Sequence, residues 1–247
     1  MTRDALSRAT FGGTINANPI WSPDGKRLAF YSDRTGPSDL FSQAADGSGS
    51  AERLTTGRFI NAANSWSPDG QTIAYIEASP DTGLDIWTVG LGDRKARSFL
   101  KTRYNETAPE FSPDGHWLAY ASDESGRFEV YVQPYPGPGG KWQISTEGGT
   151  EPVWNPAGRE LFYRVRNRMM AVQVTLQPEF SAGKPVVLFE GPWLPTPLSL
   201  PNYDVSPDGK RFLMLKAADE DQGPLQIVVV QNWFQELKRR MAAGNKQ

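Results

Sequence analysis

The 247-residue sequence contains no cysteine and a single histidine, His116. Without cysteine there are no disulfides and no thiolate metal ligands, and the redox state of the compartment is left open. A zinc site would need further His or Cys ligands. Composition alone therefore predicts no metal site and no bound cofactor.

Long apolar runs and a strong net charge are also missing. No stretch is long and apolar enough to span a membrane, and residues 1–11 lack an apolar segment of signal-peptide length. The formal net charge is −2, whereas a general nucleic-acid binder needs a basic surface. We therefore expect no nucleic-acid partner, no membrane insertion by this chain, and a soluble protein that is cytoplasmic as given.

The most informative feature of the sequence is a short motif that recurs along the chain. The first copy is Trp21-Ser22-Pro23-Asp24-Gly25, and equivalent segments begin at Trp66, Phe111, Trp154 and Val205. Successive copies start 43 to 51 residues apart. In a sequence rich in turn-forming Gly and Pro, this period indicates the blades of a β-propeller.

Each copy is interpreted as up to four strands. A short strand ends at the aromatic residue, the Ser-Pro-Asp-Gly segment forms a turn, and a second strand comes next, such as Leu28-Ala29-Phe30. The third strand carries an acid and then apolar residues, and the fourth is short. We expect Trp21, Trp66, Phe111 and Trp154 to be buried at equivalent places between adjacent blades.

The predicted fold class is all-β, a β-propeller of five four-stranded blades with a short C-terminal helix. The last blade has only three strands of its own, so residues 4–10 are expected to supply its fourth strand. The alternative, that the chain is a piece of a longer propeller with further blades, stays open. The expected boundaries are 1–230 for the propeller, with blades at 14–57, 58–102, 103–146, 147–190 and 200–230 plus 4–10, and 231–247 for the helix and tail.

These motifs resemble the TolB-like and WD-repeat-like propeller families over residues 5–230. The segment from Ser122 to Trp154 and the tail beginning at Asn232-Trp233-Phe234-Gln235 are more specifically similar to the C-terminal propeller of bacterial serine/threonine kinase-like proteins. That resemblance implies a preceding kinase domain, often across a membrane, and a periplasmic location for the propeller in that case. No kinase motif is present in this sequence.

Two functions from different classes are compatible with these observations. The first is a non-enzymatic propeller that binds a protein or peptide, as the sensor or scaffold part of a larger bacterial signalling protein. The alternative is the accessory propeller of a prolyl-oligopeptidase-like serine peptidase whose hydrolase domain lies elsewhere. A ligand-binding site is expected where loops lead into the first strands and face a central funnel. Its candidate residues are Asn18, Asn64, Glu106, Glu151 and Asp204.

A partner surface is expected in the apolar, proline-rich insertion of the longest interval, at Trp193, Leu194, Leu198 and Leu200. Packing of this insertion onto the propeller is the competing interpretation.

No catalytic residues are predicted. His116 comes directly after a turn glycine, and there is no Gly-x-Ser-x-Gly elbow to supply a nucleophile beside it. The sequence around residues 137–141 does not match the pattern of a phosphate-binding loop. The motif aspartates recur with the blade period, so they are expected to stabilise turns rather than converge. A weak calcium signal comes from Asp81, Asp85, Asp123 and Glu129, which lie outside any calcium-loop pattern.

Overall fold

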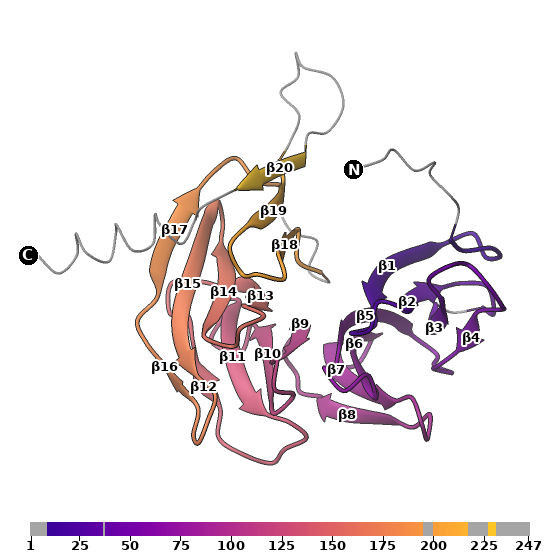
Figure 1. Cartoon of the computed structure of the whole chain (residues 1–247). Helices are drawn as coiled ribbons and strands as arrows, with labels where there is room; N and C mark the ends of the chain where they lie inside the picture. Colours follow the sequence, from indigo (N-terminus) through magenta and orange to yellow (C-terminus); the bar gives the residue numbers. More distant parts are fainter. Residues whose placement is uncertain (1–8, 37, 195–199, 217–226, 231–247) are drawn as a thin grey trace, which may run out of the picture. The chain divides into compact units, whose positions relative to one another are not determined.

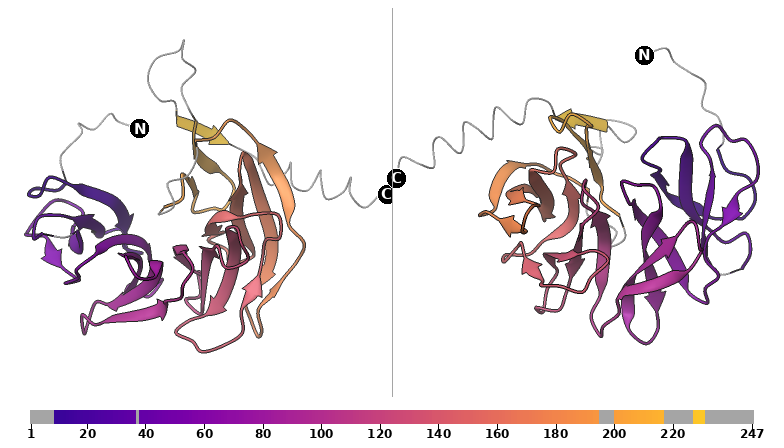
Figure 2. Two further views of the ribbon diagram at one scale, coloured as in Figure 1. Left: turned by 180° about the vertical axis from the view of Figure 1, so that it is seen from behind. Right: turned by 60° about the horizontal axis from the view of Figure 1, so that its bottom comes forward.

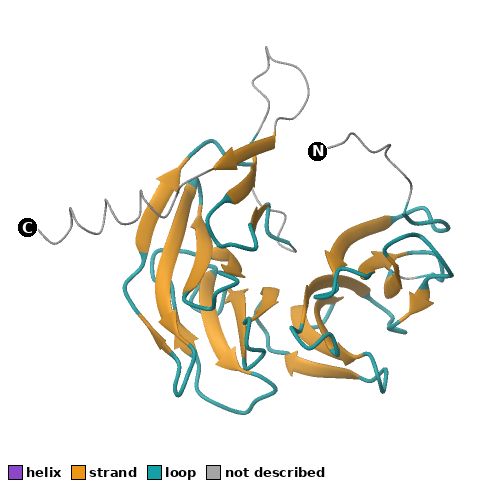
Figure 3. Ribbon diagram, viewed as in Figure 1, coloured by secondary structure: helices purple, strands orange, loops and turns teal. Residues whose placement is uncertain are grey.

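The computed structural model describes residues 9–36, 38–194, 200–216 and 227–230. Within these ranges the chain is entirely strands, turns and loops, with no helix (Figure 3). It divides into two compact units, residues 1–105 and residues 106–247. The helix expected at 231–247 lies outside the described residues.

The first unit consists of two antiparallel four-stranded sheets, each with its strands in chain order. Figure 1 labels them. The first sheet contains β1 (Asn16–Trp21), β2 (Arg27–Ser32), β3 (Asp39–Ala44) and β4 (Glu52–Arg53); the second contains β5 (Ile60–Trp66), β6 (Thr72–Ser79), β7 (Gly83–Gly90) and β8 (Ala96–Leu100).

The second unit consists of three further antiparallel sheets, seen from two sides in Figure 2. They contain β9 (Glu106–Phe111), β10 (Trp117–Ser122), β11 (Glu129–Pro134) and β12 (Trp142–Gln143); β13 (Thr150–Trp154), β14 (Glu160–Val165), β15 (Arg168–Thr175), β16 (Ser181–Ala182) and β17 (Val186–Glu190); and β18 (Tyr203–Val205), β19 (Phe212–Leu215) and β20 (Ile227–Val230).

The prediction of an all-β fold made of five blade-like sheets is confirmed. The fourth sheet has one strand more than expected, because the long β15 pairs with β16 along one half and with β17 along the other. The described part of the fifth sheet has three strands. Its expected fourth strand, residues 4–10, falls mostly in residues 1–8, outside the described ranges. No helix in the described ranges has the length and hydropathy needed to cross a membrane.

The recurring motif forms the same hydrogen-bonded turn in four of its five copies; the copy at Trp154 has Asn155 in place of the serine, and Asn155 Oδ1 accepts the Ala157 N–H (3.0 Å). In the first copy the Ser22 hydroxyl donates to Asp24 Oδ1 (2.6 Å) and accepts the Arg27 N–H (2.9 Å), and Asp24 Oδ1 accepts the Lys26 N–H (3.0 Å). The same three bonds recur in the copies at 67–72, 112–117 and 206–211. Gly25 completes the turn with φ of 68°, in the left-handed region that favours glycine. The motif aspartates therefore stabilise turns, as predicted.

A second repeated feature is a buried acid at the start of the third strand. The Asp39 side chain is fully buried and accepts bonds from Arg53 Nε (3.0 Å), the Thr55 hydroxyl (3.1 Å) and the Gly57 N–H (2.9 Å). Its Oδ1 also accepts from Asn61 Nδ2 (3.4 Å) in β5. The carboxylate thus joins the third strand, the fourth strand and the segment leading into the next blade. We call this contact the acid latch.

The third blade repeats the acid latch with Glu129, which is 1% exposed. Its carboxylate accepts from the Ser145 hydroxyl and from the Gly148 N–H (2.9 Å), and it pairs with Arg127 Nε (2.6 Å). Ser145 in turn accepts the Val130 N–H (2.8 Å), as Thr55 accepts the N–H of Leu40 in the first blade. One hydroxyl therefore bridges a backbone donor and a buried carboxylate in both blades.

We predict that Ser145→Ala lowers the free energy of unfolding by about 1–3 kcal/mol, because Glu129 and the Val130 N–H each lose a buried partner. Ser181→Ala, at an exposed position in β16, is the matched control and should change it little. Urea unfolding of both variants measures the difference. Equal unfolding midpoints would show that the acid latch does not contribute to the free energy of unfolding.

The aromatic residues that end the first strands differ in burial. Phe111 is 5% exposed and Trp154 is 4% exposed, as predicted, and Trp66 is half-buried. The prediction is wrong for Trp21, whose side chain is 60% exposed. The preceding blade covers Trp154, whose Nε1–H donates to the Glu110 carbonyl (3.0 Å), so burial of the motif aromatic depends on packing against another blade and not on the motif alone.

Trp154→Ala should cost about 3–5 kcal/mol of stability because it empties a buried site between two blades. Trp154→Phe keeps most of the apolar volume but loses the bond to the Glu110 carbonyl, so its cost should be about 1 kcal/mol. Thermal or urea unfolding distinguishes the two. A Trp154→Ala protein as stable as the wild type would show that this contact does not hold the blades together.

Candidate functional site

The first strands of the three blades in the second unit are connected to one another. The Trp154 indole of β13 bonds to the Glu110 carbonyl of β9, and the Tyr203 hydroxyl of β18 donates to the Glu151 carbonyl of β13 (2.8 Å). The side chains of β9, β13 and β18 therefore meet in one region. This region is the candidate functional site.

A bulge interrupts the first strands at the same repeat position. Asn18, Ala108 and Glu151, each three residues before the motif aromatic, have φ values of 51°, 50° and 57°. The pairing register of each strand shifts at this point. A non-glycine residue in this region of φ is uncommon, and bulges re-aim side chains next to functional sites. Here the bulge directs Glu151 toward the next blade.

Glu151 forms a buried ion pair with Arg164 of β14. The Arg164 Nη1 to Glu151 Oε1 distance is 3.0 Å, and the two side chains are 4% and 1% exposed. The Asn202 N–H donates to Glu151 Oε2 (2.6 Å), and Arg164 also donates to the carbonyls of Leu194 and Arg166. Burial raises the pKa of Glu151 to about 7, against the opposing effects of the Asn202 N–H and Arg164. The ion pair joins β13 to β14 within one blade, and the Asn202 N–H links Glu151 to the segment that leads into β18 of the next blade.

Glu110 of β9 and Asp204 of β18 are two acidic residues in the same region, and we call them the acidic pair. Desolvation, together with the negative charge of Asp204, raises the pKa of Glu110 to about 8. Partial desolvation also raises the pKa of Asp204, although that residue is exposed and its Oδ1 accepts the Val205 N–H (2.7 Å). Neither carboxylate forms an ion pair with a cation in the described ranges.

The predicted site residues separate into two groups. Asn18 and Asn64 belong to the first unit, so the convergence of all five residues on one funnel stays a prediction. Glu151 and Asp204 both lie near Tyr203, because the charge of each raises the pKa of that residue. Glu106 begins β9, is 2% exposed, and instead acts on Tyr120 of its own blade.

Sequence reasoning missed Glu110, Arg164 and Tyr203. A usable signal existed for Glu110, because Glu110 and Asp204 both stand directly before the last residue of a first strand. The five candidate residues predicted from the loops stand at differing distances before the last residue of the first strand, whereas Glu110 and Asp204 stand at the same distance. No sequence pattern marks Arg164 or Tyr203 as a site residue.

The insertion proposed as a partner surface is partly built into the second unit. Trp193 is half-buried, packs edge-on against Phe189 with ring centroids 5.9 Å apart, and bridges to Lys216. The Leu194 N–H donates to the Leu215 carbonyl (3.0 Å), and Leu200 is half-buried. Leu198 lies outside the described residues. Packing accounts for Trp193 and Leu194, and the partner surface stays a prediction.

The residues considered for catalysis, phosphate binding and calcium binding make structural contacts. His116 is exposed in its turn, and its backbone N–H donates to Asp114 Oδ1 (3.2 Å). Residues 137–141 lie in the loop between β11 and β12, where Lys141 pairs with Glu124. Of the acids weighed for calcium, Asp85 accepts from the Thr82 hydroxyl (2.6 Å) and Glu129 forms the acid latch. Across the described ranges, no three His, Asp or Glu side chains gather closely enough to hold a metal ion.

Comparison with known proteins shows which folds this chain resembles. A family model described as the TolB β-propeller domain matches residues 1–84 and 58–187. No curated protein matches the sequence. Among solved structures, TolB from Acinetobacter baumannii is similar with a TM-score of 0.68 and 16% identity, covering 88% of this chain and 52% of that one.

Two further solved structures show the range of proteins that share the fold. A puromycin-hydrolyzing peptidase of Mycobacterium tuberculosis is similar over 88% of this chain and 36% of its own, with a TM-score of 0.58 and 17% identity. A structure of a nidogen/laminin complex is similar over 81% of this chain and 72% of its own, with a TM-score of 0.58 and 12% identity. At these identities the likeness concerns the fold alone.

The raised pKa of Glu110 predicts a pH-dependent stability. The folded protein keeps a proton on this carboxyl up to about pH 8, whereas an ordinary glutamic acid side chain loses it near 4.5. The free energy of unfolding should therefore fall as the pH rises between these values, by at most about 1.4 kcal/mol per pH unit for this one proton. Glu110→Gln should reduce that slope and stabilise the protein at pH 8.

Glu190→Gln, at an exposed position in β17, is the control and should leave the slope unchanged. Urea unfolding between pH 5 and pH 8 measures all three proteins. An identical slope in Glu110→Gln and the wild type would contradict the assignment.

Proposed function

The chain belongs to the TolB β-propeller family, and from that premise we propose that it is a non-enzymatic propeller that binds a protein or peptide. The observation that supports this proposal best is the acidic pair of Glu110 and Asp204. The charge of Asp204 acts on Glu110, the pKa values of both carboxyls are raised, and neither is paired with a cation in the described ranges. A basic side chain of a partner would neutralise the pair.

The direction of the pKa shifts favours a cationic ligand over a neutral one. Desolvation disfavours the charged forms of both carboxyls, and the charge of Asp204 further disfavours that of Glu110, so an approaching ammonium or guanidinium would stabilise them most. Asp204 is exposed and can be reached from solvent. The neighbouring Glu151 is already paired with Arg164 and would serve to position the first strands.

At the level of the whole protein, we propose that the propeller is the sensor or scaffold part of a larger bacterial signalling protein. The resemblance of its third blade and tail to kinase-associated propellers supports this role. Reading the coding sequence on both sides of this chain tests it, because a kinase domain in the same gene is expected.

The second candidate is the accessory propeller of a serine peptidase of the prolyl-oligopeptidase type. The fold likeness to the Mycobacterium tuberculosis peptidase, over 36% of that chain, favours it. A hydrolase domain in place of a kinase domain in the flanking coding sequence would select this candidate.

A basic peptide should bind at the acidic pair with release of a proton. We predict that acetylated pentalysine binds the purified protein at pH 7, and that ionisation of Glu110 on binding releases up to one proton. Calorimetry in two buffers of different ionisation enthalpy measures the release. Asp204→Asn should weaken binding roughly tenfold, and Glu110→Gln should abolish the proton release.

Two controls accompany this measurement. Glu190→Gln should bind pentalysine like the wild type, and acetylated pentaglutamate should not bind. Undiminished binding and proton release by both Asp204→Asn and Glu110→Gln would show that the acidic pair is not the peptide site.

A further inference from the structure

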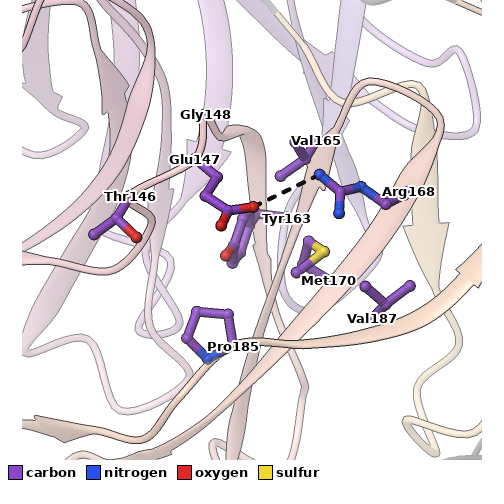
Figure 4. A pocket seen from close by; sticks show the side chains of 9 residues that line it. All are labelled: Thr146, Glu147, Gly148, Tyr163, Val165, Arg168, Met170, Pro185 and Val187. Carbon is purple, nitrogen blue, oxygen red and sulfur yellow. Dashed lines mark ion pairs between the residues drawn. The ribbon is translucent and has the colours of Figure 1, made fainter.

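A pocket of about 280 Å³ lies within the second unit, away from the acidic pair. Figure 4 shows it between the loop that joins β12 to β13 and the strands β14, β15 and β17. Its apolar lining comes from Tyr163, Val165, Met170, Pro185 and Val187. Tyr163, Val165 and Met170 are at most 9% exposed, so this part of the lining belongs to the core.

Two opposite charges face one another at this pocket. Glu147 comes from the loop and Arg168 from the start of β15, with 4.0 Å between Glu147 Oε2 and Arg168 Nη2 (Figure 4). The Glu147 side chain is 82% exposed and that of Arg168 is 33% exposed. A guanidinium carries five donors and a carboxylate about four acceptor sites. A single contact of 4.0 Å leaves most of this capacity for a ligand.

Arg168 occupies a position that carries the acid latch in other blades. Residue Ser32 pairs in register with Asp39, Ser122 pairs with Glu129, and Val165 pairs with Arg168. Ser32, Ser122 and Val165 each stand 11 residues after the motif aromatic of their blade. The fourth blade thus places a cation where two other blades bury a latching carboxylate.

The loop side of the pocket is held in place by the latch of the third blade. Glu129 accepts the Gly148 N–H (2.9 Å), the Phe128 carbonyl accepts the Gly149 N–H (2.9 Å), and Arg127 donates to the Thr146 carbonyl. These bonds fix the backbone on both sides of Glu147. The pocket is therefore formed before a ligand arrives, which reduces the entropic cost of binding.

We propose that this pocket binds a free apolar α-amino acid in its zwitterionic form. The α-carboxylate would pair with Arg168, the α-ammonium with Glu147, and the side chain would pack on Val165, Met170 and Val187. The interior of a peptide chain has neither of these charges and would leave both residues without a strong partner. A volume of about 280 Å³ accommodates one such amino acid and is slightly below the range typical of drug-sized ligands.

Amino-acid binding at this pocket uses other residues than the acidic pair and does not depend on the proposed peptide binding. It requires both signs of charge and an apolar lining, whereas the acidic pair requires a cation only. Failure at one site would therefore leave the other unaffected.

The first test compares three leucine derivatives on the wild-type protein. L-leucine should bind saturably by calorimetry or ligand-observed NMR. N-acetyl-L-leucine lacks the ammonium and L-leucinamide lacks the carboxylate, so each should bind at least about tenfold more weakly. Equal binding of the three compounds, or no saturation by L-leucine in the millimolar range, would overturn the proposal.

The second test uses variants with matched controls. Arg168→Gln and Glu147→Gln should each weaken L-leucine binding about tenfold, while Arg159→Gln and Glu179→Gln, exposed residues of the same blade outside the pocket lining, should not. Val187→Trp should abolish binding by filling the pocket without changing either charge. Arg168→Gln binding L-leucine as tightly as Arg159→Gln would contradict the assignment, and thermal unfolding verifies that each variant is folded.

Discussion

The acid latch is the interaction on which the arrangement of neighbouring strands depends. The Asp39 carboxylate at the start of the third strand is buried, and burying a carboxylate is costly unless its oxygens are hydrogen-bonded or paired. Asp39 obtains its partners from the fourth strand, the connecting segment and the first strand of the next blade. Local chain geometry and contact between successive blades are therefore coupled through one group, and neither can change without exposing an unpaired charge.

In the fourth blade a cation replaces the latching carboxylate. Arg168 takes the latch position there, and instead of tying the chain it faces Glu147 beside an apolar pocket. The loop opposite stays fixed because Glu129 still latches the third blade. At this repeat position the structural contact of the latch is therefore replaced by a charged residue at the edge of a pocket. The neighbouring latch of Glu129 supplies the rigidity that a binding site needs.

Carboxylates serve three different purposes in this protein, and the environment of each determines which. In the turns, Asp24 and Asp208 accept hydroxyl and backbone bonds, which lower their pKa. In the latches they are buried and paired. At the first strands of the second unit, desolvation raises the pKa of both Glu110 and Asp204, and the charge of Asp204 raises that of Glu110 further. The basic peptide proposed as a partner would meet this last group.

The sequence by itself determined the features that repeat locally. The motif at Ser22-Pro23-Asp24-Gly25 contains every side chain of its hydrogen-bonded turn, so its period predicted five blade-like sheets and the structural role of the aspartates. The tertiary structure decided which side chains meet across blades. Glu110, Arg164 and Tyr203 come from different strands, and the burial of Trp154 depends on a covering blade rather than on its own motif. Such contacts depend on how separate sheets pack, which no single repeat encodes.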